Sequence, residues 1–146
     1  MNELPPVFRD QRKIDADHLN LLSIFHFVGA GLAVLGILFL LAHYTMLHFV
    51  FANPKMWENQ KGGPPPVEFF AAFKWFYVVF GFWFFCSGVL NIMSGLFLRA
   101  RKCRTFSVVV ASLNCLHMPL GTTLGVFTII VLMRDSVREL YDNHVR

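Results

Sequence analysis

The sequence predicts an all-α integral membrane protein, a small helical bundle of four membrane segments in which the last two form a hairpin with a Pro/Gly turn. Of the 146 residues, 55% are hydrophobic and 15% are charged, whereas soluble domains carry about 25% charged residues. Asp, Glu, Lys and Arg are absent from residues 19–54, 75–98 and 105–133, and an apolar tract of about 18 residues is typical of a membrane helix. These features exclude a disordered chain, a disulfide scaffold and a soluble enzyme of the usual kind.

The charged start of the chain and the tract after it predict the first membrane helix of a single transmembrane domain. Residues 1–18 form a cytoplasmic N-terminal segment in this interpretation. The helix covers residues 20–43, with Asp17 as its N-cap, because a carboxylate there accepts hydrogen bonds from the first free amides. Residues 44–51 mix aromatic and polar side chains, so they are compatible with an interfacial segment or with a longer, tilted helix.

A loop rich in helix breakers separates this helix from the second one. Together with the interfacial segment, the loop spans residues 44–66 and ends in the run Gly62-Gly63-Pro64-Pro65-Pro66. Such a run cannot lie inside a helix, because proline lacks an amide donor and clashes with the preceding turn. The second helix is predicted over residues 68–98, and the basic loop 99–104 follows it.

The third tract carries a break in its middle, where Pro119 is followed by Gly121. One interpretation is a helical hairpin over residues 105–134, and the alternative is a third helix with a kink. Short basic loops stay on the cytoplasmic side of a membrane. Four segments place ten Lys and Arg residues on one side against two, whereas three segments place seven against five. The charges favour four segments, with both termini and the tail 135–146 in the cytoplasm, and a hairpin that enters the membrane and returns has the same topology.

Glycines recur at helical spacing on the predicted helices. Gly81, Gly88 and Gly95 are each seven residues apart, so a rotation of about 700° between neighbours places them on one stripe of the second helix. Small residues of this kind let membrane helices approach closely. Four further glycines are predicted packing positions, namely Gly29 and Gly36 in the first helix and Gly121 and Gly125 in the hairpin. We predict helix packing at these positions, within one chain or in a homo-oligomer or larger membrane complex.

Two sets of residues are candidates for a site inside the membrane. His26 and His117 lie at compatible depths for the axial ligands of a b-type haem, and the alternative is a buried histidine that bonds a carbonyl group or Asn114. The break in the hairpin brings polar residues to membrane depth, as in transporters with broken helices. This polar set consists of Asn91, Asn114, His117, Thr122 and Thr123.

The sequence contains no recognisable catalytic set. The three apolar tracts hold no carboxylate pair, and no phosphate-binding loop, nucleophile elbow or zinc-protease motif occurs. We therefore expect no enzymatic activity, no cofactor and no metal. The net charge of +4 is concentrated in the segments predicted to face the cytoplasm, and it fits contact with anionic membrane lipid better than nucleic-acid binding.

Two stretches of the chain carry a resemblance to a family. They are HLNLLSIFH at residues 18–26 and PLGTTLGVFTIIVLMR at residues 119–134. With these stretches the chain resembles a group of small bacterial multi-span inner-membrane proteins that have no assigned activity. The resemblance implies a multi-pass protein of the bacterial inner membrane and leaves its chemistry open. We expect a non-enzymatic structural or assembly subunit, and the alternatives are a small channel or transporter with a site at residues 119–123, or a b-type haem protein.

Overall fold

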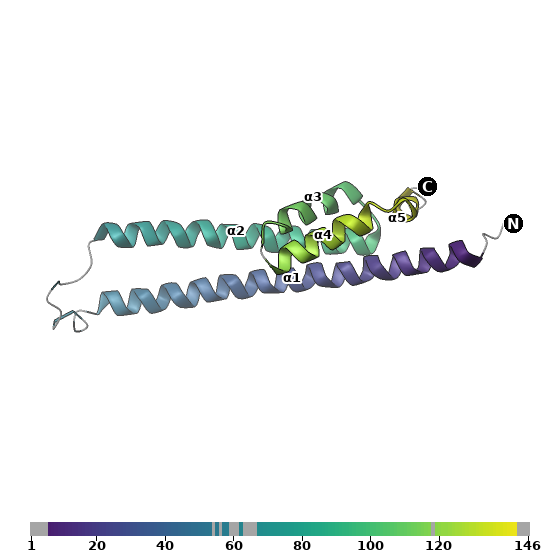
Figure 1. Ribbon diagram of the computed structural model, residues 1–146. Helices are drawn as coiled ribbons and strands as arrows, with labels where there is room; N and C mark the ends of the chain where they lie inside the picture. Colours follow the sequence, from purple (N-terminus) through teal and green to yellow (C-terminus); the bar gives the residue numbers. More distant parts are fainter. Residues whose placement is uncertain are drawn as a thin grey trace. The chain divides into compact units, whose positions relative to one another are not determined.

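The predicted all-α class is confirmed by the computed structural model, in which every element of the described part of the chain is a helix (Figure 1). The helices are α1 (Pro6–Ala52), α2 (Val67–Ala100), α3 (Arg104–Asn114), α4 (Leu120–Leu132) and α5 (Asp135–Asp142). The structure describes residues 6–53, 55, 57, 58, 62, 67–117 and 119–142. Parts of four predicted segments lie outside these ranges, namely residues 1–5, residues 54, 56, 59–61 and 63–66 of the loop, residue 118 of the hairpin and residues 143–146.

Helix α1 has 47 residues and is longer at both ends than the sequence predicts. It begins at Pro6, because the fixed φ and missing amide of proline suit the first position of a helix. Asp17 therefore lies inside the helix, and its assignment as an N-cap is wrong. The aromatic residues 44–51 continue the helix to Ala52 and are not a separate segment. Thr45 fits into this part of the helix because its hydroxyl group bonds carbonyl oxygens of its own preceding turn.

Helices α1 and α2 are both long and apolar enough to cross a membrane. Their candidate spans are Gln11–Ala52 and Ala71–Ala100, and a crossing takes about 20 helical residues. Helix α2 extends one residue before and two residues beyond its predicted range. By contrast, α3 and α4 have 11 and 13 residues, which makes them about 17 and 20 Å long. The chain is thus a small helical membrane protein with two full-length candidate spans and a pair of shorter helices.

Helices α3 and α4 fold back on one another as a hairpin (Figure 1). Their backbones lie close together because two glycines of α4 face carbonyl groups of α3. A Cβ atom at Gly121 would lie 2.5 Å from the Asn114 carbonyl oxygen and from His117 Cβ, and one at Gly125 would overlap the carbonyl oxygen of Ala111. The predicted hairpin is confirmed, and the alternative of a single kinked helix is wrong.

Residues 135–142 form the short helix α5, where the sequence predicts only a tail. Helices α4 and α5 meet at an angle of 72°. Together they are long and apolar enough to form one bent span. On α5, Val137 and Tyr141 are four residues apart and both are buried. The exposed residues of this helix are charged, namely Asp135, Arg138, Glu139 and Asp142. A charged outer face of this kind is typical of a helix at a membrane surface rather than inside a membrane.

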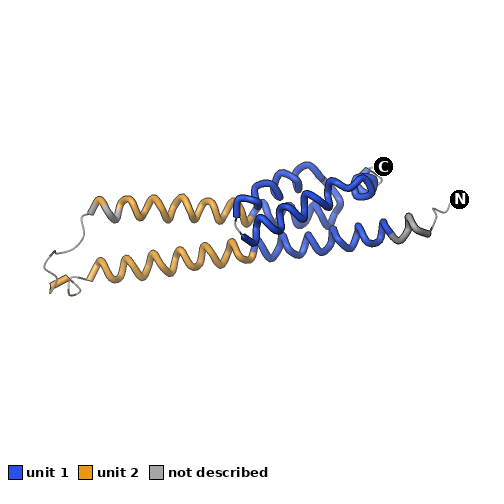
Figure 2. Tube along the Cα trace, viewed as in Figure 1, with its two compact units in different colours: residues 1–30, 89–146 blue, residues 31–88 orange. Residues whose placement is uncertain are grey.

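The chain divides into two compact units, coloured separately in Figure 2. Unit 1 comprises residues 1–30 and 89–146, and it contains the hairpin, α5, the first part of α1 and the last part of α2. Its core is an apolar cluster to which all of these helices except α3 contribute buried side chains, and Val108 of α3 packs against the cluster. The buried members are Leu19, Leu22, Leu98, Val131, Leu132, Val137 and Tyr141.

Unit 2 comprises residues 31–88, and its two helical segments are joined by aromatic contacts. The His43 Nδ1 atom lies 2.5 Å from the hydroxyl oxygen of Tyr77, and the ring of Tyr44 meets that of Tyr77 edge-on, with centroids 5.3 Å apart. Many large apolar side chains of unit 2 are exposed, as expected of helices that face lipid tails. They include Phe39, Phe49, Trp75, Phe82 and Phe85.

Candidate functional site

Four buried polar side chains, one from each of α1, α2, α3 and α4, meet inside unit 1. They are His26, Asn91, Asn114 and Thr128, with exposed fractions of 0, 3, 5 and 0%. A polar group that is buried among apolar atoms costs free energy unless it forms hydrogen bonds. These four residues, which we call the polar network, therefore have to satisfy one another.

Hydrogen bonds connect the polar network from helix to helix. The side-chain amides of Asn91 and Asn114 bond reciprocally, each Nδ2 donating to the Oδ1 of the other, at 3.1 and 2.8 Å. His26 Nδ1 lies 2.9 Å from Asn91 Oδ1, and since an amide oxygen only accepts, His26 donates this bond. Thr128 donates to the Leu124 carbonyl oxygen at 2.7 Å, and its Oγ1 lies 3.4 Å from His26 Nε2. The network thus joins α1 to α2 and α4, and α2 to α3.

A second polar contact in unit 1 also joins α1 to α2. Ser23 is buried and donates its hydroxyl hydrogen to the Gly95 carbonyl oxygen at 2.8 Å. Two glycines leave room for this approach: a Cβ atom at Gly95 would lie 3.1 Å from the ring of Phe27, and one at Gly29 would lie 3.5 Å from Asn91 Oδ1. Close packing of small residues and interhelical hydrogen bonds are the main forces that hold helices together in lipid. Both are present here.

Five of the seven predicted packing glycines contact other parts of the same chain. Gly29, Gly95, Gly121 and Gly125 do so in unit 1, as described above, and in unit 2 a Cβ atom at Gly36 would lie 3.0 Å from the ring of Phe84. Gly88 is buried on α2. A Cβ atom at Gly81, however, would meet nothing within 4 Å. Gly81 is therefore the predicted packing position that stays open to another molecule.

The two threonines of the hairpin turn bond carbonyl groups of the turn itself. Thr122 donates its hydroxyl hydrogen to the Cys115 carbonyl oxygen at 2.8 Å, and the exposed Thr123 donates to the Pro119 carbonyl oxygen at 3.1 Å. His117 lies in the same turn, and its amide donates to the last carbonyl group of α3. Thr122 thus satisfies a carbonyl group just beyond the end of α3, whereas the Pro119 carbonyl oxygen also accepts the backbone amide of Thr123 at 3.3 Å.

The two haem candidates lie on different elements, His26 on α1 and His117 in the turn between α3 and α4. Both ring nitrogens of His26 face side-chain oxygens, so a ligand atom bound at Nε2 would have to displace Thr128. His117 lies in the turn between α3 and α4, where its backbone amide bonds the Asn114 carbonyl oxygen. In the part of the chain that the structure describes, no three His, Cys, Asp or Glu side chains are placed to hold a metal ion. The geometry at His26 suits a hydrogen bond that holds helices together.

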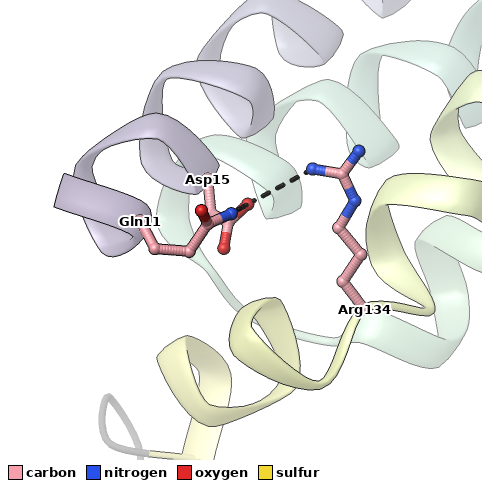
Figure 3. A network of polar contacts seen from close by, with 3 residues as sticks. All are labelled: Gln11, Asp15 and Arg134. Atoms are coloured by element: carbon pink, nitrogen blue, oxygen red, sulfur yellow. Dashed lines mark hydrogen bonds and ion pairs between the residues drawn. The ribbon is translucent and has the colours of Figure 1, made fainter. Parts of the chain in front are cut away.

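A buried acid on α1, which the sequence analysis does not single out, makes a further contact in unit 1. Asp15 is fully buried, and its Oδ1 lies 3.4 Å from Nη1 of Arg134, at the bend between α4 and α5, and 3.4 Å from Nε2 of Gln11 (Figure 3). A more exposed pair, Arg12 and Glu139, joins α1 to α5 with 3.7 Å between charged atoms. These contacts hold the bend against α1. Asp15 lies four residues before the buried Leu19 and therefore on the same face of the helix. This spacing is the feature of the sequence that could have indicated its burial.

Comparison of the chain with family models, with curated proteins and with solved structures finds no match. The function is therefore inferred from the contacts of the chain itself.

Proposed function

We propose that this chain is a non-enzymatic assembly subunit of a membrane, and that it associates with a second copy of itself through the face of α2 that carries Gly81. The observation that carries this proposal is the open space at Gly81. The other glycines of the set with described Cβ surroundings all lie against residues of the same chain. The polar groups of the network are likewise satisfied within unit 1, and they form a support for helices rather than a reaction centre.

The surroundings of Gly81 support a helix as the partner. Glycine inside a helix costs about 1 kcal/mol relative to alanine, and the close approach of another backbone to Gly81 would offset that cost. Phe82 and Phe85 beside it are exposed and offer aromatic surface for that approach. In lipid, a gap of this kind between large side chains is where a second helix gains close packing.

Replacing Gly81 with leucine tests this proposal. We expect the oligomer to dissociate to the monomer in mild detergent, since the new side chain fills the space needed by the partner but meets nothing in its own chain. The matched control is Ala72→Leu, an exposed position on the same helix, which is nine residues away and therefore about half a turn around the helix. The measurement is mass by light scattering. A Gly81→Leu variant that keeps the size of the unchanged protein would contradict the proposal.

We further infer that the chain lies in the bacterial inner membrane with both termini in the cytoplasm. The uneven distribution of Lys and Arg between the two sides supports this topology. The hairpin supports it as well, because α3 and α4 are each shorter than a crossing and fold back together, so that α5 returns to the side on which α2 ends.

Labelling of single cysteines with a membrane-impermeant maleimide tests the topology. Cys103 is exposed and free, so a chain that keeps only this cysteine should react from the cytoplasmic side. Glu58→Cys in a cysteine-free chain should react from the opposite side, and Asp142→Cys from the same side as Cys103. If Asp142→Cys reacts together with Glu58→Cys, the hairpin crosses the membrane once and the topology is wrong.

A further inference from the structure

The basic loop after α2 is fixed against the end of α4. Helix α2 ends at Ala100, and the amides of Arg101 and Lys102 donate to its last-turn carbonyl groups at 3.3 and 3.0 Å. Arg101 has a φ of 53°, which is the left-handed conformation that commonly closes a helix. Arg104 opens α3, and its Nε donates to the Leu132 carbonyl oxygen at the end of α4 at 2.7 Å. The backbone of Arg101 and the side chain of Arg104 are therefore held in place.

Tyr141 of α5 carries a buried hydroxyl group at the same end of unit 1. Its exposed fraction is 5%, and its ring belongs to the apolar cluster that contains Leu98, Leu132 and Val137. Among the described residues, its hydroxyl oxygen has no hydrogen-bond partner. Buried tyrosine hydroxyl groups usually have one. Leu132, whose carbonyl oxygen accepts the bond from Arg104, is a member of the same cluster.

Two arginines of the basic loop act on Tyr141 through their positive charge. Burial raises the pKa of Tyr141 to about 12, and the nearby charges of Arg104 and Arg101 act against that rise. Two acids of unit 1 are paired with other arginines, since Asp15 contacts Arg134 and Glu139 contacts Arg12. Within the described ranges, no ion pair of Arg101 or Arg104 is found.

We propose that Arg101, Arg104 and Tyr141 form a binding site for a phosphate group. Guanidinium groups bind phosphate oxygens through charge-assisted hydrogen bonds, and the tyrosine hydroxyl would donate the bond that it lacks in the chain itself. A phosphate can come from the headgroup of an anionic phospholipid or from inorganic phosphate in solution. The site adjoins the end of the candidate span Ala71–Ala100, where headgroups lie, and this position favours the lipid.

Thermal unfolding of the full chain in a neutral detergent tests the site. Phosphatidylglycerol, added in increasing amounts, should raise the melting temperature in a saturable way, and phosphatidylcholine, whose phosphate is accompanied by a cation, should not. A saturable rise with inorganic phosphate alone would support the site and assign it to free phosphate. If none of the three raises the melting temperature, the proposal is wrong.

Two variants and a control identify the residues. Arg101→Gln should weaken phosphatidylglycerol binding about tenfold, as expected for the loss of one charge-assisted bond. Tyr141→Phe should weaken it about fivefold and yet leave the lipid-free melting temperature unchanged or higher, because it removes a hydroxyl group that has no partner. The control is Lys102→Gln, an exposed neighbour in the same loop, which should bind as the unchanged protein does. Equal losses in Lys102→Gln and Arg101→Gln would show general attraction of charges and overturn the site.

Discussion

Replacing Asn91 with leucine is expected to lower the free energy of unfolding by about 3 kcal/mol. Leucine has a similar branched shape but forms none of the three hydrogen bonds that Asn91 makes with His26 and Asn114. The Nδ1 proton of His26 and the amide of Asn114 are then buried without their partners. An orphaned buried group costs about 1–3 kcal/mol. Reversible unfolding in mixed detergent micelles, followed by circular dichroism, measures the loss.

Two companion variants separate the network from the general effect of changing a buried residue. The double variant Asn91→Leu with Asn114→Leu should lose less than the sum of the two single losses, because each single change already breaks the reciprocal pair. Ser94→Ala is the control on the same helix: Ser94 is fully buried, and its hydroxyl oxygen has no hydrogen-bond partner among the described residues. The network would not be stabilising if Asn91→Leu cost no more than Ser94→Ala.

The second large effect is expected at Gly125, where leucine should lower the free energy of unfolding by about 3 kcal/mol. A Cβ atom at this position would overlap the carbonyl oxygen of Ala111 and would lie 2.6 Å from Cys115 Sγ. The backbone of α3 cannot move aside without separating the two arms of the hairpin. The same unfolding experiment measures the loss, and limited proteolysis should cut the variant in residues 115–119.

Gly31 provides a control with the opposite sign. A Cβ atom there would meet nothing within 4 Å, so Gly31→Ala should raise the free energy of unfolding by about 0.5–1 kcal/mol through higher helix propensity. If Gly125→Leu and Gly31→Ala had similar effects, close contact between the helices of the hairpin would not be the cause.

The membrane helices could be predicted because their signals are local. The uncharged tract 75–98 already indicates most of α2, and the Pro119 and Gly121 break predicts the turn between α3 and α4. The hairpin was favoured over a kinked helix by charge counting alone. The structure explains why the two helices pack as a hairpin: Gly121 and Gly125 let the backbones of α3 and α4 come into contact.

What the sequence did not reveal depends on partners that are distant along the chain. Thr128 was missed because its neighbours in sequence are apolar, and its role follows from a histidine 102 residues away. Asp15 was missed because its partner, Arg134, lies 119 residues away along the chain. The start of α1 was misplaced because the charged residues 9–13 were interpreted as lying outside the helix, whereas the helix continues through them.

The short arms of the hairpin have a consequence for how this chain is made. A segment enters the bilayer during synthesis when it is long and apolar enough to partition there unaided, and α1 and α2 satisfy this requirement. Helix α3 is too short to do so, and it would expose Asn114 to lipid if it entered without a partner. In the topology proposed above, the bonds between Asn114 and Asn91 of α2 satisfy this amide once α3 has entered. We therefore expect the last third of the chain to insert after the first two helices are in place.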